Sequence, residues 1–433
     1  MKQKIVVLII LLLLLSGSGI ASSSILNYKN NAKNELDNCH LIKNVPYVAK
    51  EEGFSCDYAP IAMTLKYYGI NTSIPEIFYE IGGGYAQGYG YPLKRVSDFP
   101  FRKLPLKFLC LGDLSVGGTE DYKFLASLYG CSFEYDDYNF VANKEKCWKE
   151  YWAKVQNYIS SDIPVVTAVD PLSWPPYREF TNTTMPPSIF SRSCCVIVIV
   201  GFNLSNSTIC FHDQYVGEKN SSIDGSYKWI NISELKKAAG RAIWDMKETR
   251  YEILLIKKIS DALPEDLIVE LVHNRNIKKL EGLKEVYDSD FIQNNFKEYG
   301  IYALKSLKKD MQSLFIYRLP FYKIFHVVVP SLGYPFSKMI DYFNCESIDE
   351  SQVVQYMKSN TKIASQYYGD IALLELEAKY WRNLTNLTID LKGAVYKGSW
   401  FKFPIESKSI INNMVETIDN IIQIQEMIIL ANS

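Results

Sequence analysis

Apolar and polar positions follow one pattern over residues 40–258 of this chain and another over residues 263–433. In the first stretch, short apolar runs alternate with segments of helical spacing. The run CCVIVIVGF, residues 194–202, is rich in β-branched residues, which is typical of a strand buried on both faces. The runs at 163–170 and 250–258 predict two further strands. We therefore expect an α+β domain over this stretch.

Residues 263–433 carry long segments whose apolar positions recur with helical periodicity. They include PEDLIVELVHNRNIKKL, NNFKEYGIYALKSLKKDMQSLF and SIINNMVETIDNIIQIQEMIIL. We expect an all-α domain here, with the methionine and aromatic stripes packed in its core.

A cysteine precedes one predicted helix of the first domain. Residues 59–69, APIAMTLKYYG, have helical spacing and end in glycine. Asp57 is a natural N-cap, and Pro60 is tolerated in the first turn. Cys56 is then expected at the helix N-terminus, where the helix dipole favours thiolate over thiol. The alternative is a structural cysteine that forms a disulfide.

A glycine-rich loop, IGGGYAQGYGYP at residues 81–92, follows a short predicted helix with Pro75 near its start. It lacks the spacing of a phosphate-binding loop. The alternatives are a flexible turn and a loop that lines a substrate groove. The groove candidates are Gly82, Gly83, Gly84 and Tyr85.

The N-terminus has the pattern of an export signal. Two lysines precede the apolar run at residues 5–15, and small residues follow it. The run is shorter than the roughly 18 residues that a membrane-spanning helix needs. We expect a signal peptide or an uncleaved N-terminal anchor over residues 1–22 and a linker over 23–39. The protein is then secreted or extracellular, with membrane contact only through such an anchor.

Eight N-x-[ST] sequons accompany this signal. In an exported chain such a set predicts exposed loops that carry glycans. The acceptor residues are Asn71, Asn182, Asn203, Asn206, Asn220, Asn231, Asn383 and Asn386.

The composition bears on which ligands and which disulfides the protein is expected to have. At 48% hydrophobic and 22% charged residues, the chain has enough apolar residues for a sizeable core, and its net charge of −1 gives nucleic-acid binding no support. Nine cysteines in an oxidising compartment predict some disulfides, with at least one cysteine left over in a monomer. The sequence contains no C-x-x-C pair and no histidine-rich cluster, so a metal site is not expected. It also contains no motif that predicts a cofactor. The cysteines are Cys39, Cys56, Cys110, Cys131, Cys147, Cys194, Cys195, Cys210 and Cys345.

The segment VPYVAKEEGFSCDYAPIAMTLKYYG resembles the opening of the C39-like cysteine peptidases, which have a papain-like fold. The resemblance implies a VPY strand, Cys56 as nucleophile and the helix that follows it. The pair CCVIVIVGF and ICFHDQY resembles the two strands that carry the family's histidine and aspartate, and Asp213 falls at the aspartate position.

The glycine-rich loop is similar to that of a related group, the family of the N-terminal domain of butirosin biosynthesis protein H. That group contains acyltransferases with a helical C-terminal domain, and YGIYALKSLKKDM and AKYWRNLTNL are similar to that domain. The resemblance covers most of the mature chain. It implies a papain-like domain at residues 40–258, followed by an α-helical domain at 263–433.

Two positions depart from the family pattern. Cys195 stands where the family has its histidine, and Lys50 stands where it has a glutamine that assists the oxyanion. Thiol catalysis needs a base and an acid, and histidine serves as both near neutral pH. His212 adjoins Asp213 and is expected to face away from it on a strand. His40, His273 and His326 have no assigned role.

Two functions therefore remain open. The first is a thiol-dependent hydrolase or acyltransferase acting on a peptide, amide or acyl substrate. It would use Cys56 as nucleophile, Asp213 as orienting group, Lys50 as positive charge and an unconventional base. The second is a non-catalytic protein whose groove binds a peptide, a glycan or a surface partner. A disulfide between Cys56 and Cys195 is a further hypothesis if their Cα atoms lie within about 7 Å, and buried thiols are its alternative.

Overall fold

The structure is a computed structural model, and it describes most of the chain from residue 38 onward. The described residues are 38–51, 57–86, 88–90, 111–112, 119–139, 143–180, 195–215, 224–240, 249–287, 296–317, 334–396 and 403–433. The predicted signal or anchor at 1–22 and nearly all of the predicted linker lie outside them.

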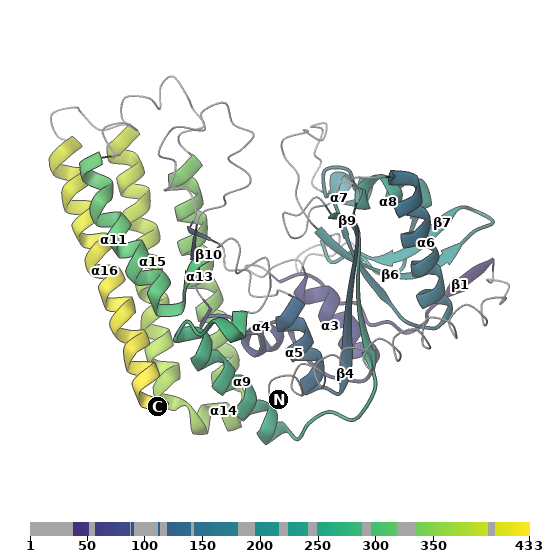
Figure 1. Cartoon of the computed structure of the whole chain (residues 1–433), viewed down its shortest axis with the longest axis horizontal. Coiled ribbons are helices and arrows are strands. Elements are labelled where there is room, and N and C mark those ends of the chain that lie inside the picture. The colour runs from purple at the N-terminus through teal and green to yellow at the C-terminus, as the bar shows by residue number, and fades with distance from the viewer. Residues whose placement is uncertain are drawn as a thin grey trace, which may run out of the picture.

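An antiparallel sheet forms the centre of the first domain (Figure 1). Its strand order is β4-β9-β5-β6-β7-β8, and β1 pairs with the far half of β6. Every residue of β6 from Cys195 to Phe202 is buried, which confirms the strand predicted from the apolar run. The strands are β1 (Cys39–Leu41), β4 (Cys131–Asn139), β5 (Val165–Val169), β6 (Cys195–Asn203), β7 (Thr208–His212), β8 (Lys228–Asn231) and β9 (Thr249–Lys258).

Helices pack around this sheet. In Figure 1, α6 and α8 lie beside the strands, and α3, α4 and α5 lie between the sheet and the long helices of the second domain. The helix predicted at 59–69 is present as α3. These helices are α3 (Tyr58–Tyr67), α4 (Ile74–Glu80), α5 (Thr119–Leu128), α6 (Lys144–Ser160), α7 (Pro175–Phe180) and α8 (Ile232–Ala239).

Four long helices, α11, α13, α15 and α16, run side by side in the second domain (Figure 1). They enclose an apolar core that includes Phe343, Trp381 and Met414. This arrangement confirms a papain-like α+β domain followed by a helical domain. The helices are α9 (Glu265–Leu280), α11 (Gly300–Tyr317), α13 (Tyr334–Ser359), α14 (Thr361–Gln366), α15 (Tyr368–Tyr396) and α16 (Phe403–Ala431).

One strand interrupts the helical half. Strand β10 (Phe296–Tyr299) pairs with β2 (Gly88–Gly90), which in turn pairs with β3 (Leu111–Gly112). The glycine-rich segment expected to be only a loop thus contributes β2 to a sheet shared by the two domains. The two glycines of β2 gave no strand signal in the sequence, because glycine is a poor strand former.

The two domains also share a core. Val353 and Met357 of α13 belong to the same buried apolar cluster as Tyr79 and Tyr85 of the first domain. The contact between the domains therefore includes part of one continuous apolar core.

Three further expectations can be compared with the described residues. No disulfide joins any two of their six cysteines, and Cys56, Cys110 and Cys194 lie outside them. No described helix is long and apolar enough to cross a membrane. The described part of the chain has no group of three metal-ligating side chains.

Most of the predicted glycan acceptors can be located. Asn71, Asn206, Asn231, Asn383 and Asn386 are exposed, and Asn203 is half-buried. Asn231 caps helix α8 by accepting a hydrogen bond from Ser233 N. Asn182 and Asn220 lie outside the described residues.

Candidate functional site

The candidate residues meet where β6 begins and β7 ends. The two strands are antiparallel, with Val198 opposite His212. This register brings Cys195, the first residue of β6, alongside the residues that follow β7. Asp213 and Gln214 are therefore neighbours of Cys195 although they are far from it in sequence.

Asp213 is completely buried and its carboxylate is held by N–H donors. Trp174 Nε1 donates to Oδ2 at 2.8 Å, and the backbone N–H of Tyr215 donates to Oδ1 at 3.0 Å. The backbone N–H of Asp213 itself donates to Gly225 O at 3.0 Å. A Cβ on Gly225 would lie 2.1 Å from Asp213 O, so this close approach requires glycine. The aspartate is thus fixed in position by the chain around it.

Cys195 is 1% exposed. The hypothetical disulfide with Cys56 stays a prediction, because Cys56 lies outside the described residues. The amide nitrogen of Gln214 lies 4.0 Å from the Cys195 sulfur, at the limit of a weak hydrogen bond. Gln214 is itself completely buried. The sequence gave no signal for this contact.

Lys50 lies against the same turn. Its backbone N–H donates to Gln214 O at 3.2 Å, and its Nζ lies 4.9 Å from the centre of the Tyr215 ring. Tyr47 OH donates to Asp213 O at 3.0 Å. The segment before the nucleophile position thus follows the end of β7. The expected VPY strand is not formed, since residues 45–47 belong to no strand and β1 ends at Leu41.

Cys56, the candidate nucleophile, lies outside the described residues. The next residue, Asp57, occupies the N-cap position of α3, but its side chain caps no backbone N–H. The expected cap is therefore wrong, because the carboxylate instead accepts a hydrogen bond from the buried Tyr122 of α5. Burial, followed by the nearby Asp57 charge, raises the pKa of Tyr122 and keeps its donor proton in place. A side-chain hydrogen bond thus links the start of α3 to α5.

The described histidines lie elsewhere. His212 faces away from the Asp213 side chain, between the rings of Tyr47 and Tyr227 at 5.9 and 4.5 Å. Phe211, on the other face of β7, packs on Trp174, the residue that also binds Asp213. The expected orientation of His212 thus agrees with its contacts.

His212 is also unsuited to proton transfer near neutral pH. Burial lowers its pKa to about 4, and neither ring nitrogen has a hydrogen-bond partner in the described part of the chain. His40 bonds Asp162, and His273 bonds Asn432 in the second domain. His326 lies outside the described residues.

The four groove candidates occupy the contact between the domains. Gly82, Gly83, Gly84 and Tyr85 are all buried. Gly82 has a φ of +101°, and a Cβ there would lie 2.5 Å from Lys279 Cδ of α9. Tyr85 OH lies 3.9 Å from Met357 Sδ of α13. These residues therefore pack against the helical domain instead of lining an open groove, because the second domain covers them.

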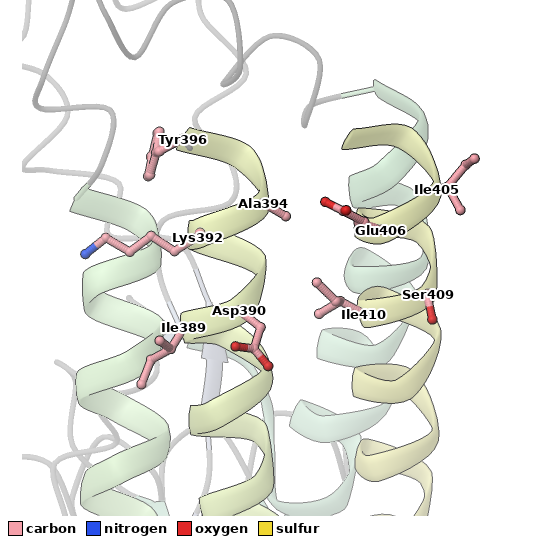
Figure 2. A pocket seen from close by; sticks show the side chains of 10 residues that line it. Ile389, Asp390, Lys392, Ala394, Tyr396, Ile405, Glu406, Ser409 and Ile410 are labelled. Atoms are coloured by element: carbon pink, nitrogen blue, oxygen red, sulfur yellow. The ribbon is translucent and has the colours of Figure 1, made fainter. Parts of the chain in front are cut away.

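A separate groove of about 980 Å³ lies at one end of the helical bundle, between the end of α15 and the start of α16 (Figure 2). Apolar, charged and small side chains line it, and it shares no residue with the cluster around Asp213. The lining residues are Ile389, Asp390, Lys392, Gly393, Ala394, Tyr396, Ile405, Glu406, Ser409 and Ile410.

Residues 42–238 match the model of the Peptidase_C39 like family. The match covers Lys50, Cys56, Cys195 and Asp213, and it supports the C39-like resemblance of the first domain. It ends before the helical domain begins. No curated protein matches the chain.

Proposed function

We propose that this protein is a non-catalytic binding protein built on a C39-like, papain-like hydrolase fold. One observation carries the proposal. The aspartate at the family's orienting position is bonded to Trp174 Nε1 and Tyr215 N, and the strand position of the family's histidine holds the buried Cys195.

The chemistry of this cluster supports the proposal. Peptide hydrolysis by a thiol needs a group that takes the thiol proton and returns it to the leaving amine. The cluster offers the Cys195 thiol, the Gln214 amide and the Asp213 carboxylate. An amide does not titrate, and a buried thiol is a poor proton carrier near neutral pH because burial opposes its ionised form. Among the described residues, the cluster thus retains the scaffold of the site without a proton shuttle.

The ligand class we propose is an extended peptide, the kind of chain on which the C39-like peptidases act. A pool of fluorescent peptides of mixed sequence is a suitable probe. We expect the full-length protein to bind members of the pool without cleaving them, and Cys56→Ala to leave binding and background hydrolysis unchanged. Hydrolysis that is lost in Cys56→Ala would overturn the proposal. Failure to bind any peptide of the pool would rule out peptides as the ligand class.

A second candidate is a thiol-dependent hydrolase or acyltransferase, and the position of Lys50 favours it. Lys50 packs on Tyr215 beside Gln214, where its charge would stabilise a thiolate or an oxyanion. An acyl group on Cys56 could then pass to water or to an amine, as in the butirosin biosynthesis protein H group. This candidate predicts a stable acyl-enzyme adduct at Cys56 after treatment with an activated ester, and its loss in Lys50→Met.

We further propose that the chain is exported, with residues 1–22 as signal peptide or anchor. The exposure of five sequon asparagines supports glycan attachment. Expression in secretory cells should give a form whose mass falls on glycosidase treatment. The exposed Asn206, in the turn between β6 and β7, is the acceptor to substitute first, because its loss disturbs no helix. An unglycosylated protein retained inside the cell would contradict export.

A further inference from the structure

Buried carboxyl groups lie on both sides of the glycine loop, residues 81–86, where the two domains meet. On the side of the helical domain, a Cβ on Gly84 would lie 3.5 Å from Glu350 Cγ and 3.7 Å from Val353. Glu350 belongs to α13 and is completely buried. The loop therefore packs directly on the helix that carries this carboxyl group.

Glu350 forms a pair with Glu377 of α15. Trp381 Nε1 donates to Glu350 Oε1 at 2.6 Å, and Gln425 Nε2 donates to Glu377 Oε1 at 2.7 Å. Glu377 is as fully buried as Glu350, and its charge acts on Glu350. Two ionised carboxylates buried side by side repel each other, so the pair favours a state in which one of them keeps its proton.

The groups that face the pair favour the protonated form. From α13 and α15, Glu346 and Glu377 act on Glu350, and from the loop Tyr85 faces both carboxyl groups. Trp381 and Gln425 of α15 and α16 are uncharged. Burial, followed by the negative charge of Glu377, holds the pKa of Glu350 well above its usual range.

A second buried carboxyl group lies on the other side of the loop. Glu80, at the end of α4, is 3% exposed and accepts a hydrogen bond of 2.6 Å from Tyr129 OH. Burial, and then the nearby Glu76, raises its pKa well above the usual range. Tyr356 of α13 donates to Glu76 at 3.2 Å, so this side also contacts the helical domain.

An ion-paired carboxylate completes the contact. Asp121 of α5 accepts from Arg275 at 2.5 Å and from Lys279 at 2.7 Å, both on α9. Lys279 Nζ also donates to Ile81 O at 2.5 Å. The loop is thus held by a fixed ion pair at its start and packs on the buried Glu350 beneath Gly84.

We propose that the contact between the two domains is a proton-dependent lock. A proton retained by the Glu350–Glu377 pair, with Glu80 as a second protonated carboxyl group, keeps the glycine loop packed on α13. Loss of these protons as the pH rises places negative charges beneath the loop and loosens it. The lock is independent of the proposed binding function, since it does not involve Cys56, Cys195 or Asp213.

The direction of the pH effect follows from linkage. A carboxyl group whose pKa is raised in the folded state keeps a proton that the unfolded chain releases above its own pKa. The unfolding equilibrium constant then rises with pH, by up to about tenfold per pH unit for each retained proton. The useful window lies between the unperturbed histidine pKa of 6.5 and about 8, where the buried Lys279 begins to lose its proton.

The test measures unfolding of the full-length protein by denaturant across this window. Glu350→Gln removes the titrating group, and its amide oxygen keeps an acceptor for Trp381. We expect the unfolding constant of the wild-type protein to rise severalfold with pH, and Glu350→Gln and Glu377→Gln to flatten that rise. Glu375→Gln is the matched control, because Glu375 is an exposed neighbour that pairs with Lys358. The same pH dependence in Glu350→Gln and the wild type would overturn the lock.

A spectroscopic measurement keeps the proposal testable if a variant fails to fold. Infrared spectra of the folded wild-type protein near neutral pH should contain the carbonyl band of a protonated buried carboxyl group. Absence of that band would overturn the proposal. Hydrogen exchange of the peptide covering residues 79–86 gives the local readout. After correction for the intrinsic pH dependence, its protection should fall as the pH rises in wild type and hold in Glu350→Gln.

Discussion

Trp174 and Asp213 share a hydrogen bond of 2.8 Å from the indole Nε1 to the carboxylate Oδ2, and both side chains are completely buried. The indole N–H is a donor only, so it stabilises the aspartate as an acceptor. The bond lies on the face of β7 opposite His212, which packs between two tyrosine rings. The side chains of Asp213 and His212 therefore point to opposite faces and have different partners.

The Trp174–Asp213 bond should contribute measurably to stability. Trp174→Phe keeps an aromatic ring on Phe211 but removes one donor to a buried carboxylate, which costs about 1–3 kcal/mol before any cavity is counted. We expect the free energy of unfolding to fall by that amount. The control is Trp229→Phe, because Trp229 is 48% exposed. Equal stability of the two variants would contradict the buried bond.

His212 should make the protein sensitive to acid. Its pKa is lowered from 6.5 to about 4 in the folded state, so the unfolded chain binds the proton more readily. Stability from this residue is complete above pH 6.5 and is lost as the pH falls towards 4, by up to about 3 kcal/mol.

The variant His212→Phe should remove this part of the acid destabilisation, as measured by denaturant unfolding at several pH values below 6.5. His273 will leave a remainder, because burial lowers its pKa as well. His40→Gln is the control, since His40 is only half-buried and bonds Asp162. If His212→Phe follows the wild-type acid curve, the assigned burial of His212 is incorrect.

Lys279 should be far more important for stability than the lysine beside it. Lys279→Met keeps most of the buried stem, but it removes one of the two cations that pair with Asp121 and the ammonium donor to Ile81 O. Removing one partner of a buried pair costs about 3–5 kcal/mol, and the retained Arg275 places this case near the lower end. Lys278→Met, at an exposed position, should change the midpoint little. Equal effects of the two substitutions would count against the buried pair.

Two glycine substitutions should act in opposite directions. Gly82→Ala places a methyl group against the Lys279 stem at a φ of +101°, so we expect a loss of about 1–3 kcal/mol. Gly393→Ala, inside helix α15 with open space around it, should stabilise by up to about 1 kcal/mol. Thermal unfolding of both variants tests these two predictions. A Gly82→Ala variant as stable as the wild type would contradict the close packing of the loop.

Local patterns were sufficient to predict the main elements. The β-branched run gave β6, helical spacing gave α3 and the long helices, and alternation along a strand gave the orientation of His212. These features depend on residues that are close in sequence. The resemblance to the C39-like peptidases then aligned Cys195 and Asp213 with two neighbouring strands, and in the structure they lie at the start of β6 and just after the end of β7.

Contacts between distant residues could not be predicted in this way. No local pattern identifies Trp174 as the donor to Asp213. Nor does one identify Tyr122 as the donor to Asp57, whose side chain therefore does not cap α3. The burial of the glycine loop depends on α9 and α13, which follow it by more than a hundred residues. A glycine-rich segment reads as an exposed loop until the element that covers it is known.

The central claim is that the site has lost its proton shuttle, and the labelling rate of Cys56 tests it most directly. The full-length protein is treated with iodoacetamide near neutral pH, and labelling is followed on the peptide of residues 51–66, with the exposed Cys39 as internal reference. An activated nucleophile reacts as a thiolate well below the ordinary cysteine pKa of about 8.5. We predict that Cys56 is labelled no faster than Cys39 and gains reactivity only as the pH approaches that value. Labelling of Cys56 at least tenfold faster than Cys39, with a rate already constant at neutral pH, would contradict the account.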